Sequence, residues 1–295
     1  MIRKGISAAG RMLRVRHYVK NILVLLPLVF NGSLFDTETL PSALWGFGAF
    51  CLLSSAVYIV NDIRDAENDR RHPVKRGRAI ASGAVPVGTA AALAGNLVVL
   101  AAAAQFLARR DDPLSWLWPG LYLLLNLAYS FGLKDIPVAD VAALAAGFLL
   151  RLLYGSAVTG IAISNWLCLT VIALSFYLGL GKRRSELVAN PGGATRGVLR
   201  RYTYGFLDKN MALCMTLALV FYSLWSVDTA TVERLGGNMV WTVPLALIIC
   251  LRYNLVTEGQ GDGDPVEALF RDKALLCLAI LFGLLTVGII YGGLL

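Results

Sequence analysis

Nine long apolar stretches dominate the sequence and restrict the folds that it can adopt. A helix needs about 20 apolar residues to cross a bilayer. Of the 295 residues, 57% are hydrophobic and only 16% are charged, which excludes a disordered chain, a coiled coil and an ordinary soluble enzyme. We therefore expect an all-α integral membrane protein, a single polytopic domain over residues 1–295. Its nine transmembrane helices are predicted at residues 21–35, 41–60, 86–107, 114–130, 138–160, 164–181, 210–227, 239–256 and 274–294.

The basic residues are distributed unevenly between the two ends of these helices. Lys and Arg total 27 against 19 Asp and Glu, a net charge of +8. Only Arg109, Arg110 and Arg234 fall on the side opposite the N-terminus, and Arg151 lies inside the fifth stretch. The positive-inside rule then predicts a cytoplasmic N-terminus and an extracytoplasmic C-terminus. In so apolar a chain, the positive charge favours the lipid bilayer as partner and not nucleic acid.

Three cytoplasmic segments carry most of the candidate chemistry: an aspartate-rich loop 61–85, a basic loop 182–209 and a loop 257–273. If the second helix continues past residue 60, Asp62, Asp65 and Asp69 fall within an arc of roughly 60°. Stacked carboxylates repel one another, so a positive partner must offset them. Basic side chains of the same loop could do so, and so could Mg²⁺, which prefers carboxylates together with substrate phosphates.

The pattern Asn61-Asp-x-x-Asp65-x-x-x-Asp69, at the end of the second of nine helices, resembles the first aspartate-rich motif of the UbiA superfamily of intramembrane prenyltransferases. The lead-in Arg16-His-Tyr-Val-Lys-Asn21 and the segment Tyr129-Ser-Phe-Gly-Leu-Lys134 add to the resemblance. It implies helices around a central cavity, and Mg²⁺ and a diphosphate bound at Asp62, Asp65 and Asp69. It also implies a bacterial inner-membrane protein whose active site faces the cytoplasm.

The sequence departs from that family after the sixth helix. Family members carry a second acidic motif there, whereas this chain has Gly181-Lys-Arg-Arg-Ser-Glu-Leu187. A helical continuation would place Lys182, Arg183 and Glu186 together, because they are three and four residues apart. Lysine and arginine can hold anionic oxygens directly, without a second metal ion.

These motifs, with Lys75-Arg76-x-Arg78 and Asp264-Pro265-x-x-x-x-Phe270-Arg271-Asp272, are similar to one subgroup, the decaprenyl-phosphate phosphoribosyltransferases. The resemblance implies transfer of 5-phosphoribose from phosphoribosyl pyrophosphate (PRPP) to polyprenyl (decaprenyl) phosphate. Pyrophosphate would be released, and the product would be a lipid-linked pentose phosphate for cell-wall or polysaccharide synthesis.

The roles expected of individual residues follow from this chemistry. The catalytic candidates are Asp62, Asp65 and Asp69, which would hold Mg²⁺, and Lys182 and Arg183, which would bind a phosphate group. Lys75, Arg76 and Arg78 would hold the 5-phosphate or the pyrophosphate, and Lys20 and Lys134 the lipid phosphate. The substrate-binding candidates are Lys20, Asn21, Tyr58, Asn61, Lys75, Arg76, Arg78, Lys134, Asp140 and Glu186.

Other interpretations stay open on the sequence alone. A conventional UbiA-type enzyme would move a prenyl group from a prenyl diphosphate to an aromatic or other acceptor, and a transporter or channel is a third possibility. Arg151 could seat the acceptor or could donate hydrogen bonds between helices. Small-residue stretches at 101–104 and 142–147 permit close helix packing within one chain or in a homo-oligomer.

Overall fold

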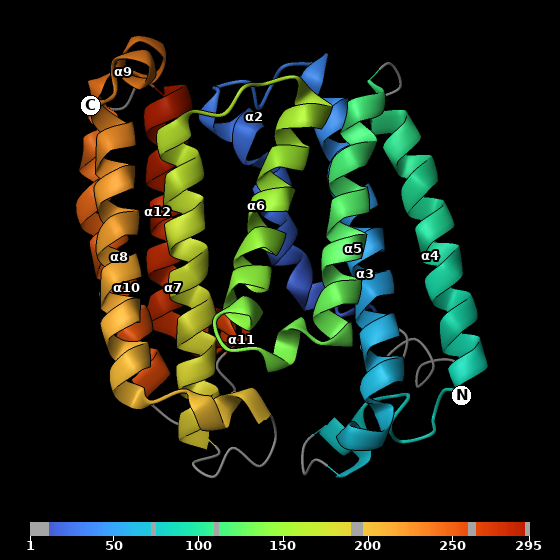
Figure 1. Cartoon of the computed structure of the whole chain (residues 1–295). Helices are drawn as coiled ribbons and strands as arrows, with labels where there is room; N and C mark the ends of the chain where they lie inside the picture. Colours follow the sequence, from blue (N-terminus) through green and yellow to red (C-terminus); the bar gives the residue numbers. More distant parts are fainter. Residues whose placement is uncertain (1–11, 72–74, 109–111, 190–196, 259–263, 293–295) are drawn as a thin grey trace.

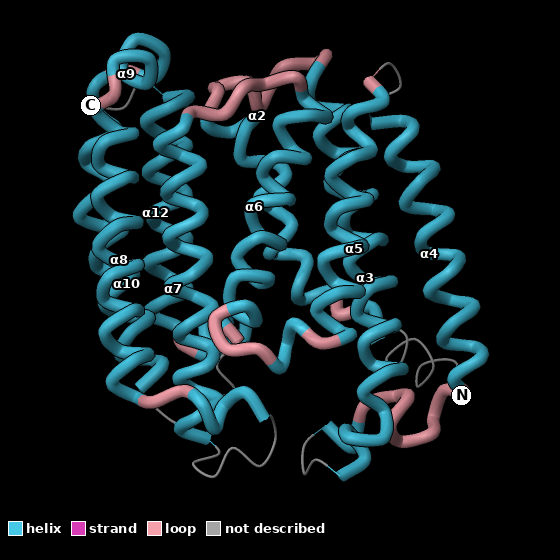
Figure 2. Tube along the Cα trace, viewed as in Figure 1, coloured by secondary structure: helices cyan, strands magenta, loops and turns pink. Residues whose placement is uncertain are grey.

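Helices and connecting loops make up the whole of the computed structural model wherever it describes the chain, at residues 12–71, 75–108, 112–189, 197–258 and 264–292 (Figures 1 and 2). The α-helices are α2 (Leu26–Phe30), α3 (Thr39–Arg71), α4 (Val87–Ala108), α5 (Leu117–Phe131), α6 (Ala139–Thr159), α7 (Asn165–Ala189), α8 (Tyr204–Val227), α9 (Thr229–Leu235), α10 (Val243–Glu258), α11 (Pro265–Arg271) and α12 (Lys273–Gly292). Shorter 3-10 segments are η1 (Val15–Leu25), η2 (Lys75–Gly77), η3 (Pro113–Trp116), η4 (Leu133–Asp135), η5 (Gly197–Arg201) and η6 (Gly237–Thr242).

Seven helices within the described ranges are long and apolar enough to cross a membrane: α3, α4, α6, α7, α8, the combined η6–α10 segment and α12. They account for seven of the nine predicted spans, so the chain is a multi-pass helical membrane protein. The predicted spans 21–35 and 114–130 are not confirmed as single long helices. The first is divided into η1 and the five-residue α2, and the second into η3 and the 15-residue α5.

Proline accounts for part of this division. Pro27 and Pro113 lie in the first turn of α2 and η3, where a missing backbone N–H costs least. Proline is unfavourable in a helix interior, so each of these residues favours the start of a new helical segment over one continuous helix.

Helix α6 lies at the centre of the bundle and contacts η1, α3, α5 and α7 (Figure 1). Gly155 permits the close approach of η1, because a Cβ atom at this position would lie only 2.2 Å from the carbonyl oxygen of Val24. The small-residue stretches are used in the same way inside the chain. Ala101 and Ala104 of α4, and Ala143, Ala145 and Gly147 of α6, are all buried.

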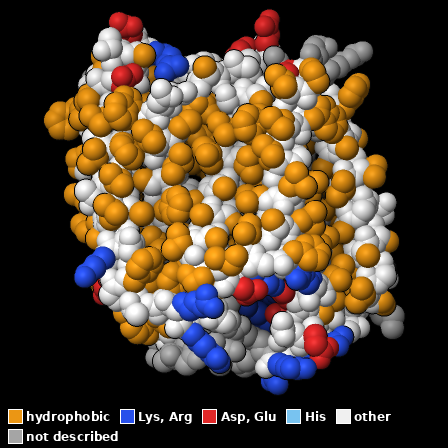
Figure 3. Space-filling view, in the orientation of Figure 1, with side chains coloured by type: hydrophobic (Ala, Val, Ile, Leu, Met, Phe, Trp, Pro, Cys, Tyr) orange, Lys and Arg blue, Asp and Glu red, His pale blue; other side chains and the backbone are white. Residues whose placement is uncertain are grey.

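Helices α3 and α7 extend past their apolar parts at the same end of the bundle, the lower end in Figure 1. Residues 61–71 therefore belong to α3 and residues 182–189 to α7, as the helical continuations predict. Figure 3 shows a broad apolar band across the bundle, and acidic and basic side chains meet in a recess below it. The charged end of the fold is thus built largely from helix ends.

Candidate active site

The last turns of α3 present Asp62 and Asp69 to one arginine. The Nη1 atom of Arg78 lies 3.0 Å from Oδ1 of Asp62 and 2.7 Å from Oδ2 of Asp69. Arg14, which precedes η1, donates from Nη2 to the same oxygen of Asp62 at 2.5 Å. Both carboxylates are buried, with exposed side-chain fractions of 11% and 7%. Two buried carboxylates thus share the guanidinium group of Arg78, and Asp62 also pairs with Arg14.

Asp65 takes a different partner. Its Oδ1 atom accepts a hydrogen bond from Nζ of Lys134 in η4 at 2.7 Å. Beside it, Asn61 accepts a hydrogen bond from Ser130 of α5 at 3.1 Å. These contacts attach the end of α5 and the start of η4 to the polar end of α3.

The three aspartates do not form one compact metal-binding group. Among the described residues, no three His, Cys, Asp or Glu side chains come together in such a group. Residues 62 and 69 are seven apart, about 10 Å along a helix axis, and Asp65 between them pairs with Lys134 and not with Arg78. Asp62 and Asp69 nevertheless meet at Arg78, and two carboxylates with substrate phosphates are the ligand set that Mg²⁺ prefers. The carboxylate oxygens of Asp62 and Asp69 are therefore suitable ligands for Mg²⁺.

A second polar group joins three separate parts of the chain. Oδ2 of Asp264, just before α11, lies 3.0 Å from Nζ of Lys20 in η1 and 3.4 Å from Nζ of Lys182 in α7. Its Oδ1 atom accepts the backbone N–H of Val266 and caps α11. The sequence prediction included both lysines but gave Asp264 no role. The signal that marks it is an aspartate directly before a proline, which is typical of a helix start.

The electrostatics of this group show how strongly its charges interact. Burial alone would raise the pKa of Asp264, but the positive charges of Lys182, Lys20 and His17 outweigh it and hold that pKa well below its usual range. Burial lowers the pKa of Lys20 to about 8, although the Asp264 carboxylate partly opposes the shift. Burial and the charge of Lys20 lower the pKa of His17 to about 4, so this imidazole is neutral at pH 7.

Arg183 lies next to Lys182 in sequence but in a different environment. Its side chain is fully buried, and Nε donates to Oδ2 of Asp140 at 2.5 Å. Nη1 donates to Glu186 at 2.6 Å and Nη2 to the hydroxyl of Tyr129 at 3.0 Å. The sequence predicted that Arg183 binds substrate oxygens. In the structure its guanidinium group instead bonds to protein partners. The same network holds Asp140 and Glu186.

A strained turn lies directly before Asp140. Val138, at the start of α6, has a positive φ of 68°, a rare conformation for a β-branched residue. Its N–H donates to the hydroxyl of Tyr202 at 2.6 Å, and that hydroxyl donates to Oδ1 of Asp140. The tyrosine therefore joins the strained turn to the buried ion pair.

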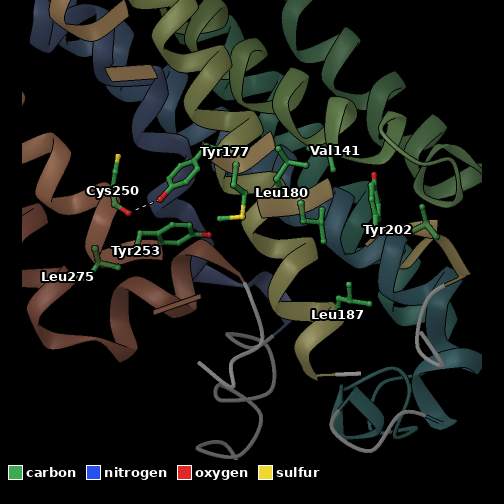
Figure 4. Packing of buried hydrophobic residues seen from close by; sticks show 11 residues of the cluster. Val141, Tyr177, Leu180, Leu187, Tyr202, Cys250, Tyr253 and Leu275 are labelled. Atoms are coloured by element: carbon green, nitrogen blue, oxygen red, sulfur yellow. Dashed lines mark hydrogen bonds between the residues drawn. The ribbon is translucent and has the colours of Figure 1, made fainter. Parts of the chain in front are cut away.

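Tyrosines also hold α7 in place close to its charged end. Figure 4 shows Tyr177 and Tyr253 side by side, with ring centroids 5.4 Å apart, and the Tyr177 hydroxyl bonded to the carbonyl of Cys250 at 2.8 Å. The hydroxyl of Tyr253 lies against Gly181, where a Cβ atom would come within 3.0 Å of it. This packing holds α7 against α10 directly before Lys182.

Arg151 and Asn21 lie deeper in the bundle than the ion pairs. Arg151 donates to Oδ1 of Asn21 at 2.8 Å, to the carbonyl of Gly147 at 2.7 Å and to the hydroxyl of Tyr122 at 3.0 Å. These contacts match the interhelical hydrogen-bonding alternative for Arg151. Asn21 is only 1% exposed and also donates to Ser54, so the structure places its side chain inside the protein, between η1, α3 and α6.

The remaining predicted residues lie at the edge of the acidic group. The Tyr58 ring lies 4.9 Å from the guanidinium carbon of Arg14 and 5.5 Å from the His17 ring. Lys75 and Arg76 of η2 are exposed.

A separate apolar cavity of about 170 Å³ lies between α3, α4, α5 and α6, away from these charged groups, and is lined by residues that include Phe50, Ala101 and Leu123.

Comparison with known proteins identifies the family. Residues 24–182 match the UbiA prenyltransferase family. The chain is 35% identical over 276 residues to the decaprenyl-phosphate phosphoribosyltransferase of Corynebacterium glutamicum, covering 92% of this chain and 82% of that protein. The enzyme of the same name from Mycobacterium tuberculosis is 34% identical over 293 residues, covering 96% and 94%.

Solved structures show the same fold. A UbiA homolog from Archaeoglobus fulgidus bound to GPP and Mg²⁺ superposes with a TM-score of 0.72 at 16% identity, covering 95% of this chain and 99% of that one. A digeranylgeranylglyceryl phosphate synthase structure gives 0.65 at 15% identity, covering 96% and 99%. The sequence match, the relatives and the shared fold agree, and the chain belongs to the UbiA prenyltransferase family.

Proposed function

We propose that this protein transfers the 5-phosphoribosyl group of PRPP to polyprenyl phosphate, with decaprenyl phosphate as the expected acceptor. One observation carries the proposal: the polar group that joins η1, α7 and the start of α11 is built around two lysines, Lys182 and Lys20. Cations in that place suit substrates whose phosphates are held without a second metal ion. The relatives named decaprenyl-phosphate phosphoribosyltransferase, similar over most of the chain, support the same conclusion.

The reaction breaks one bond and forms one. An oxygen of the lipid phosphate forms a bond to C1 of the ribose, while the bond from C1 to the pyrophosphate oxygen breaks and pyrophosphate leaves with the electron pair. A phosphate monoester is already anionic at neutral pH, so the attacking oxygen needs no general base. The barrier lies in the oxocarbenium-like state at C1 and in the charge that develops on pyrophosphate.

The residues divide this work between them. Asp62 and Asp69, with Asp65 nearby, would hold Mg²⁺, which when bound neutralises charge on the leaving pyrophosphate. Arg78, with Lys75 and Arg76 on the same segment, would hold phosphate oxygens of PRPP, and Asn61 would orient them. Lys134 would bind the lipid phosphate, and Lys20 and Lys182 would hold a phosphate group. Arg183, Asp140 and Glu186 would keep the end of α7 in position, and Tyr58 would line the site beside Arg14.

We also propose nine membrane crossings, in which the predicted spans at residues 21–35 and 114–130 add to the seven long helices. The charged end would face the cytoplasm of a bacterial cell, with the N-terminus on that side and the C-terminus outside. The basic side chains gathered at that end support this orientation. A cytoplasmic site would meet water-soluble PRPP, while the polyprenyl chain stays in the bilayer.

The test is a choice between substrates. Detergent-purified protein is incubated with Mg²⁺ and either labelled PRPP with polyprenyl phosphate, or a labelled prenyl diphosphate with 4-hydroxybenzoate. We expect product only from the first pair. Asp62→Asn and Asp69→Asn should lower its rate at least about 100-fold. Glu67→Gln, on the same helix but exposed and paired with Arg70 and Arg71, is the matched control and should keep it. Product from the second pair alone would contradict the proposal.

A further inference from the structure

Asp264 brings together two lysines that are far apart in the sequence. Lys20 is 244 residues away and Lys182 is 82 residues away, yet both ammonium groups lie within hydrogen-bond distance of the same Oδ2 atom. Among the described residues, Asp264 is the one carboxylate that forms an ion pair with both lysines. The two ammonium groups are therefore near neighbours because of this one side chain.

The group retains capacity for an anion. Two lysines and one aspartate leave a net positive charge, and the lysine side chains are 16% and 27% exposed while the aspartate is 9% exposed. Each ammonium has three donors, of which Asp264 takes one. The neighbouring Arg183 differs, because its side chain is fully buried and bonded to Asp140, Glu186 and Tyr129. Lys182, not Arg183, can reach a ligand from this part of α7.

We propose that Asp264 is a positioning residue that holds Lys20 and Lys182 side by side, so that the two lysines form one binding site for a phosphate monoester. The inference rests on the proposed function, in which both substrates carry such a group: the 5-phosphate of PRPP and the headgroup of polyprenyl phosphate. Without the carboxylate, the two ammonium groups, which now lie 3.0 and 3.4 Å from the same oxygen, would repel each other in a partly buried environment. The ammonium groups would then separate, or one of them would lose its proton.

The geometry also suggests a variant that separates the two roles of Asp264. Oδ1 of Asp264 caps α11 through the Val266 N–H, and Oδ2 bonds the lysines. Asp264→Asn keeps an oxygen for the cap and removes both the negative charge and the second acceptor oxygen, which bonds the lysines. Asp272→Asn is the matched control: Asp272 caps α12 through the Leu275 N–H at 2.7 Å and pairs with Arg252 at 2.7 Å, on the same cytoplasmic side.

The first measurement is binding, which needs no turnover. Purified wild type and both variants are melted in detergent with increasing PRPP, or with increasing short-chain polyprenyl phosphate. We expect at least one of the two ligands to stabilise wild type and Asp272→Asn, and to bind Asp264→Asn at least about tenfold more weakly. The ligand that loses affinity identifies the source of the phosphate. Equal affinity in wild type and Asp264→Asn, or no binding of either ligand by wild type, would overturn the inference.

The second measurement is kinetic and separates positioning from folding. Asp264→Asn should raise KM for that same substrate at least about tenfold while kcat changes by less than about threefold. A fall in kcat with unchanged KM would argue against a phosphate-binding site at the two lysines. If wild type binds the phosphate but makes no phosphoribosyl lipid, the proposed function fails, and the binding comparison alone decides whether the phosphate-binding site exists.

A third comparison applies even if Asp264→Asn does not fold. Lys20→Gln and Lys182→Gln are made singly and together. Lysines that bind one phosphate should weaken the same ligand, and their combined effect should differ from the product of the single effects. Independent effects on two different ligands would overturn the inference.

Discussion

Arg183 and Asp140 form an ion pair with both side chains fully buried, Nε to Oδ2 at 2.5 Å, and this pair ties α7 to α6. Removing one partner of a buried pair costs about 3–5 kcal/mol. Without the Asp140 charge, Arg183 would keep as its carboxylate partner only Glu186, whose side chain is 22% exposed. Asp140→Asn should therefore lower the free energy of unfolding, measured by denaturant titration in detergent, by about 3 kcal/mol or more. Asp208→Asn breaks the neighbouring Arg184 pair, where the carboxylate side chain is 50% exposed, and should cost under about 1 kcal/mol. Equal losses would contradict this ranking.

Metal dependence should follow the two carboxylates that meet at Arg78. Chelation of divalent ions should abolish transfer, and added Mg²⁺ should restore it. Asp62→Asn removes one of two converging charges, so we expect a severalfold or greater rise in the Mg²⁺ concentration that gives half-maximal rate. Titration of the initial rate with Mg²⁺ measures this. An unchanged Mg²⁺ requirement would argue against Asp62 as a ligand.

Lys20 should give the reaction an alkaline limit. Burial, the main cause, and the charges of Lys182 and Arg151 lower the pKa of Lys20 to about 8, against the opposing effect of Asp264. The lysine is charged below that pH and neutral above it, so the KM of its phosphate substrate should rise as pH increases through about 8. Lys20→Arg keeps the charge and should flatten the rise. KM measured from pH 6.5 to 9.5 tests this, and a rise that persists in Lys20→Arg would assign it to another group.

Gly155 should tolerate no side chain. A Cβ atom there would lie 2.2 Å from the carbonyl oxygen of Val24, and a backbone atom cannot rotate away. Gly155→Ala must move η1, which carries Lys20, and should cost on the order of 1–3 kcal/mol or more. Gly95→Ala on α4 meets no atom within 4 Å and should leave stability equal or slightly higher. Melting temperatures in detergent compare the two variants, and a normal Gly155→Ala protein would show that η1 packs differently.

The sequence identifies the helices that carry the site better than it identifies the contacts within it. Asp62, Asp65 and Asp69 recur at helical spacing beyond an apolar span, and α3 does continue to Arg71. The same holds for Lys182 and Glu186 on α7. Local periodicity is enough for these features, because helix continuation depends on neighbouring residues.

The ion-pair partner of each charged side chain could not be predicted in the same way. Arg14 reaches Asp62 across 48 residues, and Lys20 reaches Asp264 across 244, so both pairs depend on how distant helices pack. Lys182 and Arg183 are adjacent, but their side chains leave a helix about 100° apart, and only the neighbouring helices decide which one is buried. The division of residues 21–35 into η1 and α2 likewise reflects Pro27 together with packing against α6.

The most direct measurement of the central claim follows two phosphorus labels in PRPP. One preparation carries ³²P in the 5-phosphate and another carries it in the terminal phosphate of the pyrophosphate. Each is incubated with the protein, polyprenyl phosphate and Mg²⁺, and the lipid is extracted. We predict that the 5-phosphate label enters the lipid fraction and that the pyrophosphate label stays in water. Pyrophosphate label in the lipid, or neither label there, would contradict phosphoribosyl transfer by this protein.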